Sequence, residues 1–345
     1  MAPRTVVLFG GSSNERFVST ASAQNILRNL PTATPWFLTK NGEVIECAQK
    51  EVLLHSNPFE KEFCPQKPLF HFSTIENAIK NQAAQEIIVV LALHGQGGED
   101  GTIQISLEKL GVAFTGSNSE SSRLAFNMIA AKNIATQQGI RVAQHYEITP
   151  EHHELTSDIL SSWINKYGQI VLKPVADGSS VGLYILDKSS NLSSIISELS
   201  NETRHYFVEE FISGAELTVG VVGSAETSYP LPPSEVLLKK GANFDYSAKY
   251  LGTGAVEVTP ANVSEQITQA AQNVALKMHK ALGCEGYSRS DMIITNDGPV
   301  FLETNTLPGL TMASFFPQQL VANGSTLEKF LLDEIERALK VSKTK

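Results

Sequence analysis

The chain has few of the features that mark secreted, membrane or zinc-binding proteins. Its 345 residues include only three cysteines, Cys47, Cys64 and Cys284. Their odd number and wide spacing argue against a disulfide framework or a zinc site. No apolar run approaches the ~20 residues of a membrane-spanning helix, and residues 6–9 are too short for the apolar part of a secretory signal. We therefore expect a cytoplasmic protein with reduced thiols and no membrane partner.

Positive charge is also scarce. The 27 Lys and Arg residues face 36 Asp and Glu residues, which gives a formal net charge of −9. Because surfaces that bind nucleic acid are normally basic, we expect no nucleic-acid partner. The negative net charge does not argue against binding of a nucleotide, since a few local lysines and Mg²⁺ can balance phosphate charge. With 42% hydrophobic and 18% charged residues, the composition is typical of a soluble globular protein, and the length fits two or three domains of ~100–200 residues.

The most informative stretch is GYSRSDMIITNDGPVFLETNTLPGLT, residues 286–311. Two apolar-rich segments flank an Asn-Asp-Gly turn sequence, which predicts a tight β-hairpin. Because side chains alternate along strands, Arg289 and Asp291 share one face of the first strand, and Glu303 and Asn305 share one face of the second. Carboxylate and amide oxygens suit Mg²⁺, which usually completes its shell with water and substrate phosphates. The alternative is an ordinary salt bridge on a solvated sheet face.

Three further loops follow apolar, strand-like runs. GGSSNERFVS (residues 10–19) precedes a helical pattern and could bind an anion through free backbone N–H groups, or could be a plain strand–helix connection. The apolar run at 86–93 ends in HGQGGEDG (94–101), at the strand end where ligands usually bind, although a lone histidine there is more often structural. KPVADGSSVG (173–182) suits a mobile cover over phosphates, or a hairpin loop.

The order of expected elements predicts an α/β protein. Strands alternate with helices up to residue 117, which indicates a layered α/β N-terminal domain. A single helix is expected from about residue 119 to residue 138, at the start of the next domain. The helical patterns at 265–282 and 327–340 carry apolar spacing and should pack in the core.

Taken in order, these motifs resemble the D-alanine–D-alanine ligases of the ATP-grasp superfamily. The string LETNTLPGLT (302–311), with the Arg-x-Asp upstream, is similar to the metal-binding end of that family, and further matches run from about residue 5 to residue 317. The resemblance implies a three-domain ATP-grasp architecture with an N-terminal α/β domain (1–117), a central subdomain (118–215) and a C-terminal catalytic domain (216–345).

The resemblance also implies a reaction. Two D-alanines would be joined to D-alanyl-D-alanine through an acyl phosphate, for the synthesis of peptidoglycan precursors. ATP would be the co-substrate, with two Mg²⁺ ions as cofactors, which Mn²⁺ can replace. A homodimer is the assembly that the family suggests.

Roles follow from the resemblance residue by residue. The implied metal ligands are Asp291, Glu303 and Asn305. The catalytic set begins with Glu15, which holds the ammonium group of the first amino acid. Ser179 and Tyr250 join Glu15 in closing the flap over that amino acid. Arg289 and the Gly309 N–H stabilise the tetrahedral intermediate. The substrate-binding set is His94, Ser314 and Phe315, with Ser314 holding the second carboxylate. The ATP-binding set is Lys132, Lys173, Glu209, Glu210, Ile212, Glu216 and Lys249.

Three positions qualify this assignment. Related ligases often carry Lys in place of Glu210, which puts that adenine contact in doubt. Met128 stands where they have a lysine that reaches the ATP phosphates, and one interpretation is that Met128 simply packs in the core. In either case the positive charge is missing unless Lys132, one helical turn further on, or a residue of another chain supplies it. Tyr250 is kept in the flap string FDYSAKY (244–250), which favours an amide product over a D-lactate ester.

Other functions remain open at this point. One is another ATP-grasp carboxylate–amine ligase acting on different amino acids, to give a dipeptide or depsipeptide. A second is a nucleotide-binding homologue without turnover, against which the full metal set and Arg289 speak. A dehydrogenase is not favoured, because no strand–GxGxxG–helix unit with a suitably placed acidic residue is present.

Overall fold

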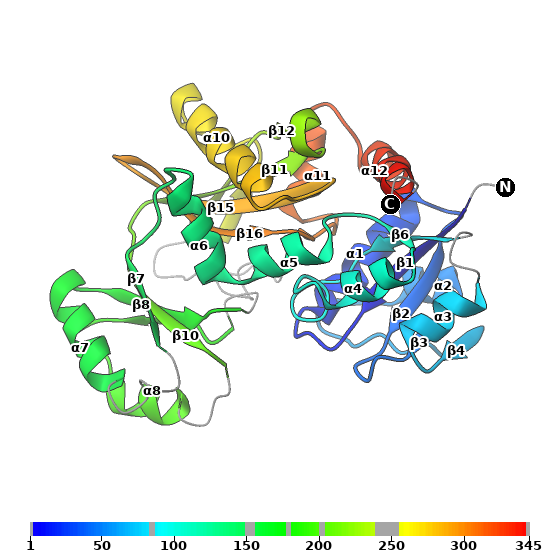
Figure 1. Cartoon of the computed structure of the whole chain (residues 1–345), viewed down its shortest axis with the longest axis horizontal. Coiled ribbons are helices and arrows are strands. Elements are labelled where there is room, and N and C mark those ends of the chain that lie inside the picture. The colour runs from blue at the N-terminus through cyan, green and yellow to red at the C-terminus, as the bar shows by residue number, and fades with distance from the viewer. Residues whose placement is uncertain are drawn as a thin grey trace.

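The computed structural model describes residues 3–82, 87–148, 156–176, 181–199, 204–238 and 255–342. Three β-sheets and the helices that cover them make up this part of the chain (Figure 1). The predicted α/β class is therefore confirmed, whereas the exact domain limits stay predictions. Among the described helices, none has the length and apolar character needed to cross a bilayer.

The first sheet has the strand order β4-β3-β2-β1-β5-β6. Strands β2, β1, β5 and β6 run parallel, and β3 and β4 are antiparallel additions at one edge. Its elements are β1 (Arg4–Gly10), α1 (Arg16–Asn29), β2 (Thr34–Leu38), β3 (Val44–Glu46), α2 (Gln49–Leu54), β4 (Phe70–Phe72), α3 (Ile75–Asn81), β5 (Ile87–Leu91), α4 (Thr102–Lys109) and β6 (Ala113–Phe114). Every residue of β5 is buried, as expected for the apolar run at 86–93, of which residue 86 lies outside the described residues.

The central sheet is smaller and wholly antiparallel, in the order β7-β10-β8-β9. Its elements are β7 (His145–Ile148), α7 (Thr156–Tyr167), β8 (Ile170–Pro174), β9 (Tyr184–Leu186), α8 (Leu192–Leu199) and β10 (Tyr206–Glu210). Leu160 and Ile164 of α7 pack with Leu172 and Val208 of the sheet in one apolar core. This unit forms a separate lobe in Figure 1.

The third sheet is antiparallel in the order β14-β13-β11-β15-β16, with β12 paired to β11. Its elements are β11 (Ala215–Val222), a 3₁₀ turn η3 (Ala225–Thr227), β12 (Tyr229–Pro230), β13 (Ser234–Leu238), β14 (Ala255–Val258), α10 (Glu265–Ala281), β15 (Tyr287–Thr295), β16 (Gly298–Asn305) and α11 (Phe315–Ala322). The small side chains of Ala271 and Ala275 let α10 approach Leu217, Val219 and Met292 of the sheet.

The segment predicted as one helix from 119 to 138 is two helices, and that prediction was wrong. α5 (Ser119–Phe126) and α6 (Met128–Gln137) are separated at Asn127, whose backbone is extended (φ −85°, ψ 101°). The Asn127 side chain accepts a hydrogen bond from the Ala130 N–H at 2.9 Å and so caps α6. Asparagine favours this role because its short amide satisfies an otherwise unpaired N–H. Both helices pack against β16 of the third sheet.

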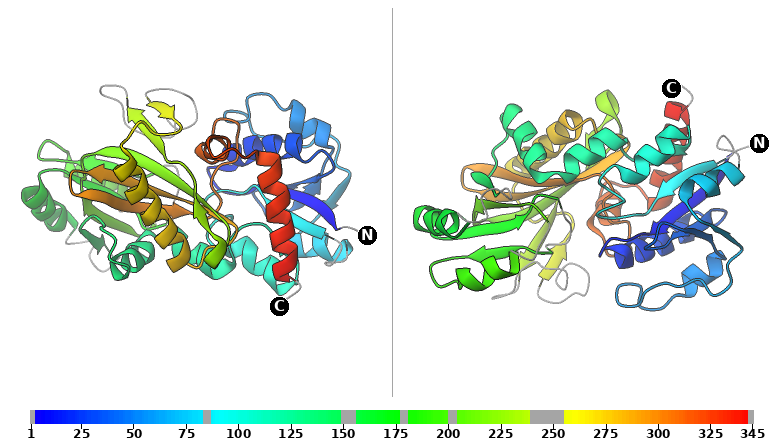
Figure 2. Two further views of the ribbon diagram at one scale, coloured as in Figure 1. Left: turned by 90° about the horizontal axis from the view of Figure 1, so that it is seen from above. Right: turned by 60° about the horizontal axis from the view of Figure 1, so that its bottom comes forward.

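The last helix, α12 (Leu327–Ser342), returns to the first sheet and lies against β5, β6 and α1 (Figure 2). Its Glu334 is buried and accepts the Gly116 N–H at 2.7 Å, and Arg337 pairs with Glu334 at 2.7 Å and Glu285 at 2.9 Å. These contacts connect the chain after β6 of the first sheet to the chain before β15 of the third sheet through α12.

Asn127→Ala is expected to lower the free energy of unfolding by about 1 kcal/mol, because the Ala130 N–H loses its capping oxygen. Urea unfolding measures this change. Asn133→Ala, at an exposed position of the same helix, is the matched control and should leave stability unchanged or slightly raised, since Ala is the better helix former. Equal losses in the two variants would show that the cap contributes nothing.

Candidate active site

The predicted hairpin is confirmed. β15 and β16 pair antiparallel around a two-residue turn, with Thr295 opposite Gly298. The register sets Arg289 opposite Asn305 and Asp291 opposite Glu303, and it shifts immediately afterwards, between Asp291 and Met292. The four polar side chains predicted to share a surface therefore lie together at the end of the hairpin.

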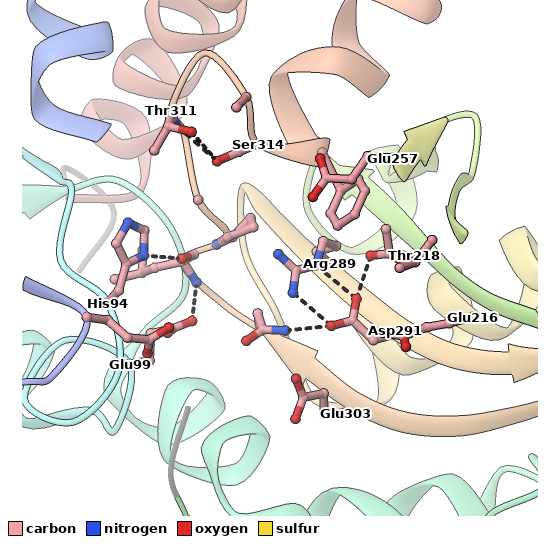
Figure 3. A pocket seen from close by; sticks show the side chains of 18 of the residues that line it. His94, Glu99, Glu216, Thr218, Glu257, Arg289, Asp291, Glu303, Thr311 and Ser314 are labelled. Atoms are coloured by element: carbon pink, nitrogen blue, oxygen red, sulfur yellow. Dashed lines mark hydrogen bonds and ion pairs between the residues drawn. The ribbon is translucent and has the colours of Figure 1, made fainter. Parts of the chain in front are cut away.

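Asp291 is the centre of this group (Figure 3). Arg289 donates to both of its carboxylate oxygens, from Nε at 2.9 Å and from Nη2 at 2.7 Å. The Thr218 hydroxyl donates to Oδ1, and the Asn305 amide donates to Oδ2 at 3.3 Å. A bidentate carboxylate–guanidinium pair fixes orientation as well as charge. Arg289 is thereby held with its guanidinium plane set by Asp291.

The turn that follows β16 is held by residues of helix α1 and of the loop after β5. His94 Nδ1 donates to the Leu307 carbonyl at 2.9 Å, and Glu99 accepts the Leu307 N–H at 3.0 Å. Ser22 Oγ accepts the Leu310 N–H at 3.2 Å and donates to His94 Nε2 at 3.0 Å, and Asn25 donates to the Leu310 carbonyl at 2.8 Å. The chain around Gly309 is therefore fixed from both sides of the turn.

Burial sets the protonation of two of these side chains. Burial lowers the pKa of His94 to about 4, against the bond to the Leu307 carbonyl that favours its charged form. The ring is therefore neutral at pH 7, with the proton on the nitrogen that faces Leu307. Burial and the nearby Glu15 carboxylate raise the pKa of Glu99 to about 8, against the N–H bonds from Gly95 and Leu307.

A pocket opens over this arrangement, with about 820 Å³ of space that includes its open mouth. It is lined by ten of the predicted site residues: Glu15, His94, Glu216, Arg289, Asp291, Glu303, Asn305, Gly309, Ser314 and Phe315. These come from the loop after β1, the loop after β5, the third sheet and the segment after β16. The fold thus gathers predicted residues that are spread over 300 positions of the chain.

Ser314 lies against the turn at the pocket wall. Its Oγ accepts the Thr311 N–H at 3.2 Å and is 2.8 Å from the Thr311 hydroxyl. A Cβ on Gly309 would come within 2.7 Å of the same oxygen, so a larger residue there would displace Ser314. Glycine is therefore needed at 309 for close packing of the turn.

Two of the predicted ATP-binding lysines, Lys132 and Lys173, lie elsewhere, at the junction of α6 and the central sheet. Lys132 Nζ lies 2.8 Å from Glu209 Oε2, and Lys173 Nζ lies 2.6 Å from Glu209 Oε1. Lys132 is fully buried, and its contact is an ion pair without hydrogen-bond geometry. Burial alone would raise the pKa of Glu209, but Lys173 and Lys132 more than offset it and bring the pKa to about 2. Burial lowers the pKa of Lys132 against the attraction of Glu209.

Other predicted residues are distributed around these two places. Glu210 accepts the Gln144 N–H at 2.9 Å and so ties β10 to the chain before β7. Ile212 follows β10 and is half-buried. Met128 is also half-buried and lines a smaller pocket beside Glu303 and Asn305, rather than packing in an apolar core. The predicted residues Ser179, Lys249 and Tyr250 lie outside the described residues.

Sequence reasoning missed several residues of the main pocket. Glu99 binds the turn after β16, and Thr218 binds Asp291. Two more missed residues, Glu257 and Thr311, line the pocket wall. Glu99 belongs to the HGQGGEDG string, so its place in that motif could have identified it as a site residue. No sequence motif marks Thr218 or Glu257 as a site residue, because single polar residues in strands look like ordinary surface positions.

Comparison with known proteins agrees with this geometry. A family model described as "D-ala D-ala ligase N-terminus" matches residues 4–117, and one described as "D-ala D-ala ligase C-terminus" matches residues 134–336. The D-alanine–D-alanine ligase of Leptospira interrogans is 35% identical, over 98% of this chain and 99% of that protein. That of Halalkalibacterium halodurans is 32% identical, over 98% and 99%. A crystal structure of the VanG D-Ala:D-Ser ligase from Enterococcus faecalis has a TM-score of 0.79 at 27% identity, covering 98% of this chain and all of that one.

The low pKa of His94 predicts a pH effect on stability. The ring has a folded-state pKa of about 4 against an ordinary value of 6.5, so the unfolded chain binds more protons between these values. Stability is then lost as the pH falls through that window, with a slope of up to about 1.4 kcal/mol per pH unit. In urea unfolding from pH 6.5 to pH 4, His94→Gln should lose stability less steeply than the wild type.

His279 provides the matched control. It is buried away from the pocket, between Ser288 and the Gly223 carbonyl, and burial lowers its pKa to about 4 as well. His279→Gln should flatten the pH profile in the same way without changing ligand binding. A His94 ring that titrates near pH 6.5 by NMR would refute the assigned neutral state.

Proposed function

The chain belongs to the D-alanine–D-alanine ligase family, and we propose that it uses ATP to join two D-alanines into D-alanyl-D-alanine for peptidoglycan synthesis in the cytoplasm. The observation that carries this proposal is the convergence, in one pocket, of Arg289, the Asp291–Glu303 pair and the Gly309 turn. The family's fold is the ATP-grasp fold, and the homodimer that the family suggests belongs to the same proposal.

The reaction needs activation because a carboxylate has a poor leaving group. A carboxylate oxygen of the first D-alanine attacks the γ-phosphorus of ATP, and the bond to ADP breaks. The amine of the second D-alanine then attacks the carbonyl carbon of the acyl phosphate, phosphate leaves, and the amine loses a proton. Arg289, oriented by Asp291, and the Gly309 N–H are suited to the oxyanion that develops, and one such donor contributes about 3–4 kcal/mol.

Mg²⁺ fits the residues at the hairpin end. Asp291 and Glu303 lie opposite each other and Asn305 adds an amide oxygen, and Mg²⁺ usually takes one or two carboxylates plus substrate phosphates. Within the described part of the chain, no three His, Cys, Asp or Glu side chains form a ready-made cation site. We therefore propose that these three residues hold Mg²⁺ jointly with ATP, where the metal would neutralise phosphate charge.

The ATP side of the proposal rests on the buried cluster of Lys132, Lys173 and Glu209. Two ammonium groups share one carboxylate, which leaves one net positive charge. Such a charge, surrounded by low-dielectric protein, attracts phosphate more strongly than a solvated lysine does. Glu216, at the pocket wall, is assigned to the ribose hydroxyls, and Glu210 and Ile212 to the adenine edge.

Glu15 is assigned to the ammonium of the first D-alanine. It lines the pocket, and its carboxylate lies close to Gly95, where a Cβ would come within 2.7 Å of it. Ser179 and Tyr250 complete that subsite in this proposal, and Lys249 joins the phosphate contacts. His94 shapes the subsite through the turn, and Ser314 and Phe315 are assigned to the second D-alanine.

The direct test is phosphate release from ATP that depends on D-alanine, with the dipeptide identified by mass spectrometry. Glu303→Gln should abolish turnover and leave the unfolding free energy nearly unchanged, because a cleft carboxylate adds little to stability. Asp297→Asn, on the exposed turn of the same hairpin, is the control and should keep full activity. Near-normal Mg²⁺-dependent turnover in Glu303→Gln would remove it from the metal site.

Met128→Lys should tighten binding of an ATP analogue by roughly 1–2 kcal/mol, as expected for one charge-assisted hydrogen bond that is partly shielded from water. The reason is that Met128 lies beside Glu303 and Asn305 and cannot donate to phosphate. Calorimetric titration in the presence of Mg²⁺ measures the change. If Met128→Lys binds no tighter while Lys132→Ala loses affinity, Lys132 already supplies the charge and no deficit exists.

A further inference from the structure

One hydrogen bond to Asp291 comes from outside the hairpin. The Thr218 hydroxyl on β11 donates to Asp291 Oδ1, and Thr218 stands directly opposite Asp291 in the pairing of β11 with β15. Because opposed side chains on neighbouring strands lie close together, a side chain as short as threonine reaches the carboxylate. Figure 3 shows this contact beside those from Arg289. Thr218 is buried and lines the main pocket.

The pair of Asp291 and Arg289 needs a contact of this kind. Both side chains project from one face of the same strand, and their bidentate pairing fixes them relative to each other. The pairing does not fix them relative to the sheet, since both side chains are carried by rotatable bonds. Asn305, which donates to the other carboxylate oxygen, is itself assigned to the metal. Thr218 is a donor from a neighbouring strand to which the proposed reaction assigns no ligand.

Thr218 is itself held in place. Threonine is branched at Cβ, which restricts its first side-chain torsion. The Gln319 amide nitrogen of α11 donates to the Thr218 carbonyl at 2.9 Å and to Ser234 Oγ at 3.0 Å. The Gln319 amide oxygen accepts the Gly220 N–H at 2.9 Å. Gln319 is fully buried, so these bonds are shielded from water. They fix α11 to the part of β11 that contains Thr218.

The close approach of α11 to β11 depends on a glycine. Gly220 stands opposite Arg289 in the pairing of β11 with β15. A Cβ at Gly220 would come within 2.7 Å of the Gln319 amide oxygen and within 2.9 Å of the Phe316 ring. The absence of a side chain at this position therefore lets Gln319 reach the backbone of β11 on both sides of Val219.

We propose that Thr218 is a positioning residue, which holds Asp291 and through Asp291 directs the Arg289 guanidinium at the oxyanion that develops in the reaction. This inference rests on the proposed ligase function. A preorganised donor stabilises a transition state when it points at the atom on which charge develops. A displacement of about 1 Å can lower the rate by a factor of about 100. Loss of the Thr218 hydroxyl therefore weakens catalysis without removing a group that touches the reacting atoms.

Two variants of Thr218 test this role. Thr218→Val keeps the branched shape and the strand preference of threonine and loses the hydroxyl. Its kcat for D-alanine-dependent phosphate release should fall about tenfold or more, while the KM for ATP stays within about twofold. Thr218→Ser keeps a hydroxyl at the same position and should therefore retain most of the wild-type kcat.

Ser290→Ala is the matched control. Ser290 lies between Arg289 and Asp291 on β15, faces the other side of the sheet, and is fully buried with its Oγ 2.8 Å from the Thr304 hydroxyl. The variant loses a buried hydroxyl from the same strand, so it should unfold at a lower urea concentration and keep the wild-type kcat. An equal fall of kcat in Ser290→Ala and Thr218→Val would overturn the proposal, because any loosening of the strand would then suffice.

A binding measurement distinguishes misplacement of Arg289 from a general defect of the pocket. A D-alanyl-D-alanine analogue with a tetrahedral phosphinate in place of the amide carries a charge like that of the oxyanion, and such analogues use the contacts that stabilise the transition state. In calorimetric titrations, Thr218→Val should bind this analogue about tenfold more weakly than the wild type and should bind ADP with unchanged affinity.

The outcomes separate this inference from the function on which it rests. No D-alanine-dependent phosphate release by the wild type would overturn the proposed function itself. An active wild type, with unchanged kcat and analogue affinity in folded Thr218→Val, would overturn the role of Thr218 alone. A Thr218→Val variant that binds the analogue normally but needs more Mg²⁺ for half-maximal rate would also overturn it, because Thr218 would then act on the metal-binding residues and not on Arg289.

Discussion

The site depends on one set of hydrogen bonds, which join helix α1 and the loop after β5 to the turn that follows β16. Ser22, Asn25, His94 and Glu99 bind backbone groups of Leu307 and Leu310. Backbone groups buried without partners are costly, so these contacts keep the turn in one conformation. A neutral His94, which its burial favours, can donate from Nδ1 to the Leu307 carbonyl and accept at Nε2 from the Ser22 hydroxyl. The turn around Gly309 is therefore held in shape by residues that pack on the first sheet, although it follows a strand of the third sheet.

Charge is arranged in two opposite ways on the two sides of the site. At the hairpin end, Asp291 is paired with the Arg289 guanidinium and a second carboxylate, Glu303, lies opposite it, which gives an excess of negative charge that favours a cation. At the junction of α6 and the central sheet, two ammonium groups share a single carboxylate, which leaves positive charge that favours phosphate. A nucleotide triphosphate with bound Mg²⁺ has the complementary pattern. In each cluster one ion of the minority sign is paired, and one charge of the majority sign is in excess and available to a ligand.

Particular elements show how far local sequence reasoning reaches. The hairpin at 287–305 was predictable, because a strong turn sequence separates two segments with a period of two. The break at Asn127 was missed, because the apolar spacing continues through it and only the capping bond of its side chain reveals the break. Lys132 was assigned from its spacing to Met128, but its complete burial and its pairing with Glu209 depend on packing between α6 and β10.

The sequence by itself determined the family, the reaction class and most of the residues at the pocket, since these are carried by short strings in which each residue type has a chemical reason. Only the tertiary structure decided which residues hold those strings in place. His94 and the Leu307 carbonyl are 213 positions apart, and Glu99 and the Leu307 N–H are 208 apart. The helical and strand periodicities of a sequence relate only near neighbours, so they do not reveal contacts between residues more than 200 positions apart. Glu257 became visible as part of the site only because the pairing of β13 with β14 sets its face toward the pocket.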